Sequence, residues 1–150
     1  MHWKTTTLLL SALVLAGSSF ATIAGDEKKA VAKSQKALQG LWTAKKGEEI
    51  FKMTFDGNKF KLEFKGESAS GTYTIDPSKN PNEMDLLIVK GTGDNTQKFE
   101  GKTSKSIYQV DGKKLKWLAN EPGKDERPEA LPKEGERAKG LYIVFDRAKK

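Results

Sequence analysis

The sequence predicts an all-β fold, an antiparallel meander of eight or nine short strands that closes into a barrel or folds as a sandwich. Three observations predict it. Apolar residues repeat with a period of two from Leu41 onward. Two turns, Asp56-Gly57 and Asp111-Gly112, each lie between alternating runs, which is a strong signal for a hairpin. Polar turns recur at regular spacing, and no later segment has the pattern of a crossover helix.

Residues 1–24 have the three parts of an export signal. Lys4 is the basic start, residues 8–16 are the apolar centre, and small residues offer cleavage after Ala21 or Ala24. The apolar centre is about half as long as the ~20 residues of a membrane-spanning helix. We therefore expect a cleaved signal, no transmembrane span, and a protein in the periplasm or outside the cell.

Residues 25–39 predict a short lead-in helix, followed by a single β-domain over residues 40–150. Acidic residues at the start of this segment and lysines further on suit the helix dipole. Val31, Ser34 and Leu38 share one face, so the apolar stripe is thin. Gly40 ends the helix.

The expected strands follow one another through polar turns. Residues 84–89 are the most continuously apolar run, so we expect both faces of that strand to be covered. Residues 91–95 predict a turn, residues 98–102 a weak strand carrying Phe99, and residues 120–139 a long polar loop with three prolines. The other strands are expected from residue 41 and over 51–55, 59–65, 68–75, 106–110, around 115–117, and over 141–146.

Histidine and cysteine are missing from the expected mature chain, because the one histidine is His2 and there is no cysteine. This excludes a Cys or Ser–His nucleophile, a thiolate or imidazole zinc site, and an imidazole general base. It also excludes disulfides, so stability must come from packing. We expect no catalytic residues, no metal site and no cofactor.

The formal net charge of +7 comes almost entirely from lysine, since Arg127, Arg137 and Arg147 are the only arginines. Specific phosphate and nucleic-acid contacts draw heavily on the arginine fork. The sequence therefore favours a solvated lysine-rich surface over a nucleic-acid site. Electrostatic attachment to an anionic polymer of the cell envelope remains an alternative.

Gly40-Leu41-Trp42, at the start of the first strand, resembles the opening signature of lipocalins and related calycin barrels. The resemblance implies a barrel whose floor is closed by Trp42 beneath the short helix. It also implies that Arg147, after the last strand, packs over the indole, a contact that contributes on the order of 1 kcal/mol. The alternative is that Trp42 is simply a core aromatic. Gly40, Trp42 and Arg147 have architectural roles in either case.

A closer resemblance covers nearly the whole mature chain. The motifs that carry it are residues 39–42, 54–60, 71–73, 75–77 and 107–112, followed by Pro122-Gly123 and Arg127-Pro128. They are similar to those of a family of small uncharacterised secreted domains that is abundant in planctomycete bacteria. The resemblance implies a lipocalin-like fold without an established activity. The chain departs from the family in residues 43–47, where the connection after the tryptophan is abbreviated.

Three residues are candidates for ligand contact: Arg127, Tyr108 and Trp117. Arg127 would offer a guanidinium to an anion at the barrel mouth, or would instead bind loop carbonyls. The aromatic set to which the other two belong either lines a cavity or fills an ordinary core. That set comprises Phe51, Phe55, Phe60, Phe64, Tyr73, Tyr108, Trp117 and Tyr142.

These observations predict a non-catalytic ligand-binding or interaction module. Its expected partner is a small apolar or anionic ligand, and the chain is taken as a monomer. The alternative is a carboxylate-based hydrolase of cell-envelope sugars, which needs two acids flanking one bond. Its candidate carboxylates sit on or beside strands, where cross-strand pairing with lysine competes with catalysis. They are Glu63, Asp85, Glu100 and Asp146.

Overall fold

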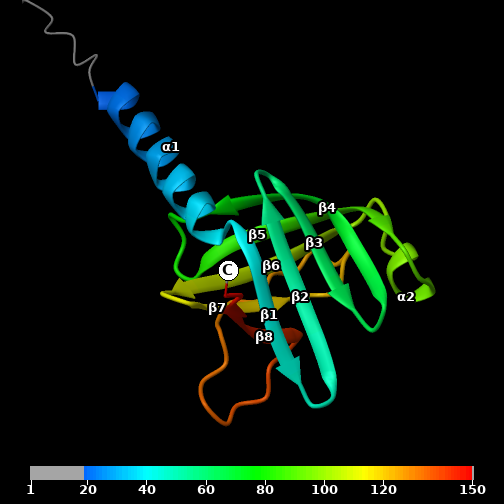
Figure 1. Ribbon diagram of the computed structural model, residues 1–150. Coiled ribbons are helices and arrows are strands. Elements are labelled where there is room, and N and C mark those ends of the chain that lie inside the picture. Colours follow the sequence, from blue (N-terminus) through cyan, green and yellow to red (C-terminus); the bar gives the residue numbers. More distant parts are fainter. Residues whose placement is uncertain (1–18, 150) are drawn as a thin grey trace, which may run out of the picture.

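The computed structural model describes residues 19–149 and confirms the closed barrel: eight antiparallel strands, each paired with the next in the chain, with the last paired back to the first (Figure 1). A helix, α1 (Ser19–Leu38), precedes the barrel, and a short helix, α2 (Asp94–Gln97), follows the fifth strand. The strands are β1 (Gly40–Lys46), β2 (Glu49–Asp56), β3 (Lys59–Phe64), β4 (Glu67–Asp76), β5 (Asn82–Gly91), β6 (Thr103–Asp111), β7 (Lys114–Ala119) and β8 (Leu141–Arg147).

Helix α1 begins earlier than predicted, at Ser19, and ends at Leu38, directly before the first strand. It projects from one end of the barrel, so that only its last turns lie against the strands (Figure 1). Most of the predicted export signal, residues 1–18, lies outside the described residues. Within residues 19–149, no helix combines the length and the apolar character that a membrane crossing requires.

Two predictions about strands were wrong. β5 is covered on its inner face alone: Met84 and Leu86 are buried, whereas Leu87 is 39% and Val89 60% exposed. Among residues 19–149, no layer of helices covers the outside of the barrel, so an apolar run does not require two covered faces. Residues 98–102 form turns after α2 rather than a strand, because Phe99 is the single apolar side chain among them.

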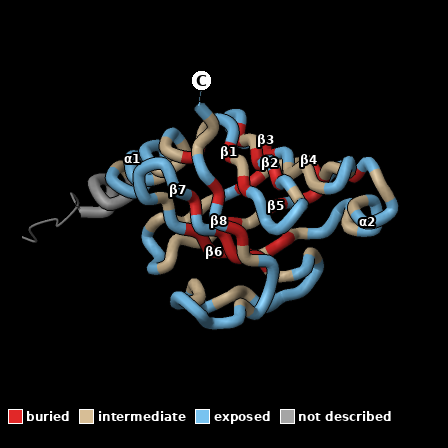
Figure 2. The backbone as a smooth tube through the Cα atoms, turned by 60° about the horizontal axis from the view of Figure 1, so that its bottom comes forward, coloured by how far each residue is buried: buried red, intermediate tan, exposed pale blue. Residues whose placement is uncertain are grey.

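The core lies inside the barrel because every strand turns alternate side chains inward. Figure 2 shows the buried positions running through the strands, while both helices are largely exposed or intermediate. A second, smaller cluster lies on the outer wall, where Ile107 of β6 and Leu118 of β7 are paired and buried. The main core comprises Leu38, Trp42, Ala44, Phe51, Met53, Phe55, Phe60, Ala69, Tyr73, Met84, Leu86, Ile88, Tyr108, Leu115, Trp117, Ala119, Ile143 and Phe145.

The end of the barrel next to α1 is closed by Trp42, which is fully buried. Its indole N–H donates to the carbonyl of Leu38 at 2.7 Å. The Arg147 guanidinium lies 4.1 Å from the ring centroid and donates to the carbonyls of Gln39, at 2.8 Å, and Ala37. These carbonyls belong to the end of α1, where no further turn of helix can satisfy them. Gly40, with a φ of 105°, turns the chain from the helix into β1.

Gln39 fastens the same end of the helix to the β2–β3 turn. The amide N–H of Gly57 donates to the Gln39 side-chain carbonyl at 2.7 Å, and the Gln39 amide group donates to the Gly57 carbonyl at 3.1 Å. The hydroxyl of Tyr73 donates to the same carbonyl at 2.8 Å. The closed end is therefore held by side chains from the helix, a hairpin turn and β4.

Replacing Arg147 with alanine should lower the free energy of unfolding by about 2–4 kcal/mol, because the cation–π contact and two charge-assisted hydrogen bonds are lost together. Arg147→Lys should lose less, since it keeps the charge and one donor. Arg137→Ala, an exposed loop substitution, is the control. Urea denaturation measures all three, and equal midpoints for R147A and R137A would contradict the assigned role of Arg147.

Candidate functional site

The end of the barrel away from α1 contains a cavity of about 620 Å³. Strands β3 to β7 supply its inner walls, and the segment after α2 and the β7–β8 loop supply its rim. Because the inward positions of these strands are apolar, the wall is apolar too. Its apolar residues are Phe60, Leu62, Phe64, Ala69, Leu86, Ile88, Phe99, Trp117, Ala119 and Leu141.

The few polar groups near this wall are bonded to one another. The Trp117 indole N–H donates to the Ser106 hydroxyl at 3.0 Å, and that hydroxyl donates to the Met84 carbonyl at 2.8 Å. The Ser104 hydroxyl donates to the Asn120 carbonyl at 2.8 Å. These bonds hold the indole in place and leave its ring to face the cavity. These polar groups are therefore not free to bind a ligand, and the wall suits an apolar ligand better than a polar one.

The rim of the cavity carries charges of both signs. Lys124 and Lys139 line it together with Glu121 and Glu126, and Lys124 pairs with Glu121 at 3.5 Å. Lys98 and Lys102 lie over the ring of Phe99, 5.0 and 5.8 Å from its centroid. The mouth thus changes from a polar, exposed edge to an apolar interior over a short depth.

The cavity depends on a sharp reversal of the chain at Gly91. The sequence predicts only a turn that starts at this residue. A β-carbon at Gly91 would lie 2.4 Å from the backbone carbon of Thr96. Glycine therefore allows α2 to fold back onto the end of β5. This return brings Thr96 and Phe99 to the rim. In the sequence, the two glycines at positions 91 and 93 are the feature that could have indicated this reversal.

Of the three predicted ligand contacts, Trp117 lines the cavity and Tyr108 does not. Tyr108 pairs with Trp117 across β6 and β7, but it lies towards the closed end and is 1% exposed. Its hydroxyl has no hydrogen bond of normal geometry. Burial raises the pKa of Tyr108 to about 12, and the nearby side chain of Ser34 in α1 opposes part of that shift.

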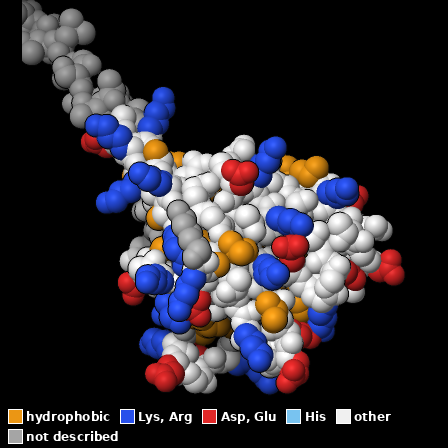
Figure 3. Space-filling view, in the orientation of Figure 1, with side chains coloured by type: hydrophobic (Ala, Val, Ile, Leu, Met, Phe, Trp, Pro, Cys, Tyr) orange, Lys and Arg blue, Asp and Glu red, His pale blue; other side chains and the backbone are white. Residues whose placement is uncertain are grey.

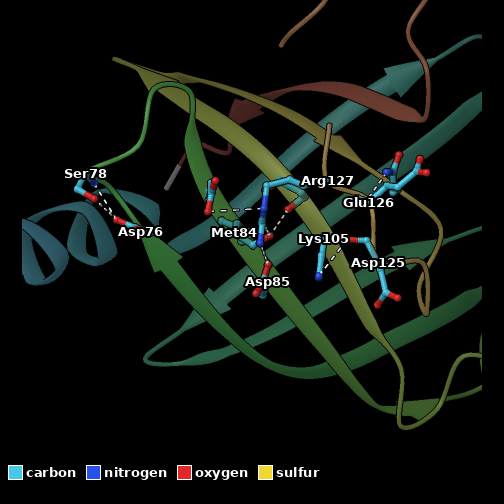
Figure 4. A network of polar contacts seen from close by, with 11 residues as sticks. Asp76, Ser78, Met84, Asp85, Lys105, Asp125, Glu126 and Arg127 are labelled. Atoms are coloured by element: carbon cyan, nitrogen blue, oxygen red, sulfur yellow. Dashed lines mark hydrogen bonds and ion pairs between the residues drawn. The ribbon is translucent and has the colours of Figure 1, made fainter. Parts of the chain in front are cut away.

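Arg127 lies on the outer wall and does not reach the cavity (Figure 4). Its guanidinium donates to the Ser106 carbonyl at 2.9 Å and to the Asp85 carboxylate at 2.6 Å, and it lies 3.6 Å from the Glu83 carboxylate. These contacts use donors that an anionic ligand would need. The geometry agrees with the predicted alternative, in which Arg127 binds carbonyls. These carbonyls, however, belong to strands β5 and β6 rather than to the loop.

The β7–β8 loop is fastened at its beginning by neighbouring contacts of the same kind. The Lys105 ammonium donates to the Asp125 carbonyl at 3.0 Å, and the Asn120 side chain donates to the Glu126 carbonyl at 2.7 Å. With Arg127, they hold residues 120–127 against β5 and β6 (Figure 4). This arrangement holds the beginning of the loop beside Leu118, which lines the same outer pocket as Asn120, Glu126 and Arg127.

The four candidate carboxylates lie at separate places, each with a different partner. Glu63 pairs with Lys61 at 3.1 Å, and Asp146 pairs with Lys114 at 2.6 Å. Asp85 binds Arg127, and Glu100 accepts the amide N–H of Gly91 at 2.9 Å. Within residues 19–149, no three acidic or histidine side chains gather in the way a metal ion requires.

The surface and the comparisons give no more specific indication. Figure 3 shows lysine and arginine side chains spread over the visible face and along α1, with acidic side chains among them. No protein-family model, curated protein or solved structure matches the chain. The fold and the cavity are therefore the basis for any proposal about function.

Tyr108→Phe should raise the free energy of unfolding by about 1 kcal/mol at neutral pH, because it removes a buried hydroxyl without a hydrogen bond. The pKa of Tyr108 is higher in the folded protein, about 12, than its ordinary value of 10. Folding therefore opposes its ionisation, and the wild-type protein loses stability as the pH rises through this range.

The stability advantage of Y108F should consequently widen between pH 10 and about 12. Urea unfolding at a series of pH values measures it. Tyr142→Phe, on the outer wall, is the matched control. A difference between Y108F and wild type that stays constant with pH would contradict the buried position of this hydroxyl.

Proposed function

We propose that this protein is a binding module that holds a small, mainly apolar ligand in the cavity at the barrel mouth. The observation that carries the proposal is the cavity itself: about 620 Å³, walled by apolar side chains and entered through a polar rim. This volume lies within the range of ligand sites, roughly 300–1,000 Å³. Trp42 closes the opposite end, so the barrel has one entrance rather than a channel.

The wider identity of the protein is part of the same proposal. The position of Arg147 over Trp42, beneath the end of a helix, supports the lipocalin-like arrangement that the sequence resemblance implies. Membership of the family of small secreted planctomycete domains rests on the sequence motifs alone. The signal-like pattern of residues 1–24 supports export to the periplasm or beyond.

A neutral fluorescent naphthylamine, N-phenyl-1-naphthylamine, tests the proposal by titration. We expect saturable binding at one site, with energy transfer from Trp117 in the cavity wall. Ala69→Phe should weaken binding at least about tenfold, because the larger ring fills the cavity. Val89→Ser, on the outer wall, should leave the affinity unchanged.

Leu62→Ser provides a second test should A69F fail to fold, since it places a hydroxyl in the wall without filling the cavity. Binding that is not saturable, or that V89S weakens as much as the wall variants do, contradicts the proposal. Native mass spectrometry of protein purified from its own host then identifies any co-purifying small molecule.

A further inference from the structure

The barrel is closed by far fewer backbone pairs between β1 and β8 than between any other neighbouring strands. β1 and β8 share two residue pairs, Trp42 with Arg147 and Thr43 with Asp146. The other neighbouring strands share six to eight pairs each. Both pairs lie next to the closed end. Towards the mouth, β1 and β8 continue side by side without pairing.

We call the facing edges of residues 44–46 and 141–145 the seam. A cleft of about 430 Å³ lies along it, between Ala44 and Lys46 on one side and Tyr142 and Val144 on the other. Free edges of this kind present backbone N–H and C=O groups that an extended segment can pair with. Each of the other neighbouring strand pairs in the described barrel shares at least six residue pairs.

The loop segment that faces the cleft does not fill this backbone role. Residues 136–138 line the cleft from the side of the loop. Within the described residues, residues 128–139 make one backbone–backbone hydrogen bond, from the Glu136 amide to the Lys133 carbonyl, at 3.0 Å. The Glu136 carboxylate accepts from the Lys133 amide at 3.1 Å, so this part of the loop bonds to itself. The strand edges stay available to another segment.

Charge around the seam favours an acidic partner. Lys45, Lys46 and Arg137 line the cleft and are exposed, whereas Glu136 is the one acidic residue in its lining. Lys116 lies beside Val144 on the outer face of β7. Ala44 and Ile143 are buried and form the inward side of the cleft. A strand lying there would turn one set of side chains to lysines and the other to small apolar groups.

We propose that the seam is a docking site for an extended acidic segment of a partner protein, which adds to the barrel as a strand. The geometry is that of β-strand addition, in which backbone hydrogen bonds supply affinity and alternate side chains supply specificity. The matching pattern alternates acidic and small apolar residues. This inference goes beyond the proposed ligand cavity and concerns a different surface.

A short synthetic peptide of alternating glutamate and valine tests the inference on the full chain. We expect saturable binding, with new protection from hydrogen exchange at the amides of residues 44–46 and 141–145. Two control peptides isolate the causes. Replacing glutamate with lysine tests the charge, and N-methylating alternate backbone amides tests the strand pairing. Both changes should weaken binding at least about tenfold.

Two double variants with equal changes in charge separate the seam from the general lysine surface. Lys45→Glu with Lys46→Glu should reduce the affinity at least about tenfold, whereas Lys28→Glu with Lys29→Glu, on the exposed part of α1, should not. Naphthylamine binding in the cavity should be unchanged in both. Failure of peptide binding at the seam would therefore leave the proposed ligand cavity unaffected. Failure of naphthylamine binding in the cavity would likewise leave the inference about the seam unaffected.

Several results would overturn the inference. Absence of saturable binding of the acidic peptide up to about 1 mM would do so, as would equally strong binding of the N-methylated peptide. Equal loss in the two double variants would assign binding to overall charge. Protection of the seam amides that rises with protein concentration, without peptide, would assign the seam to a second copy of this chain.

Discussion

Closure of the barrel depends on the contact between Trp42 and Arg147. The two strands that meet there share only two residue pairs, so backbone pairing does little of the closing. The stacked guanidinium and indole, together with the carbonyls at the end of α1, hold the first and last strands in place. The helix is thus part of the closure, because its last carbonyls are acceptors for both side chains.

This arrangement makes the two ends of the barrel different. At one end, Trp42 is fully buried beneath α1, whose last residue, Leu38, is also fully buried, and Gln39 joins the helix to a hairpin turn. At the other end, no comparable plug exists within the described residues, and the space between the inner walls stays open as the cavity. A single entrance over an apolar interior suits retention of a small molecule better than its passage.

The sequence predicted the features that depend on neighbours in the chain, such as the hairpins at Asp56-Gly57 and Asp111-Gly112 and the alternation of core residues. It did not predict features that depend on distant segments. Alternation placed Trp117 and Tyr108 inside the barrel. It did not show that Trp117 lies in the cavity wall and Tyr108 outside it, because that difference follows from the shape of the closed barrel. The sequence predicts a strand around Phe99. Its actual position at the cavity follows from the return of the chain through α2, which no local pattern indicates.

Arg127 divides the long β7–β8 loop into two parts, one bonded to the barrel wall and one that is not. Residues up to Arg127 are joined by hydrogen bonds to β5 and β6. Within the part of the chain that the structure describes, residues 129–135 make no hydrogen bond to a strand. Loop tips of this type tolerate insertion best. The tip is therefore where an epitope tag or a fluorescent label is best attached, and where differences in length between related chains should accumulate.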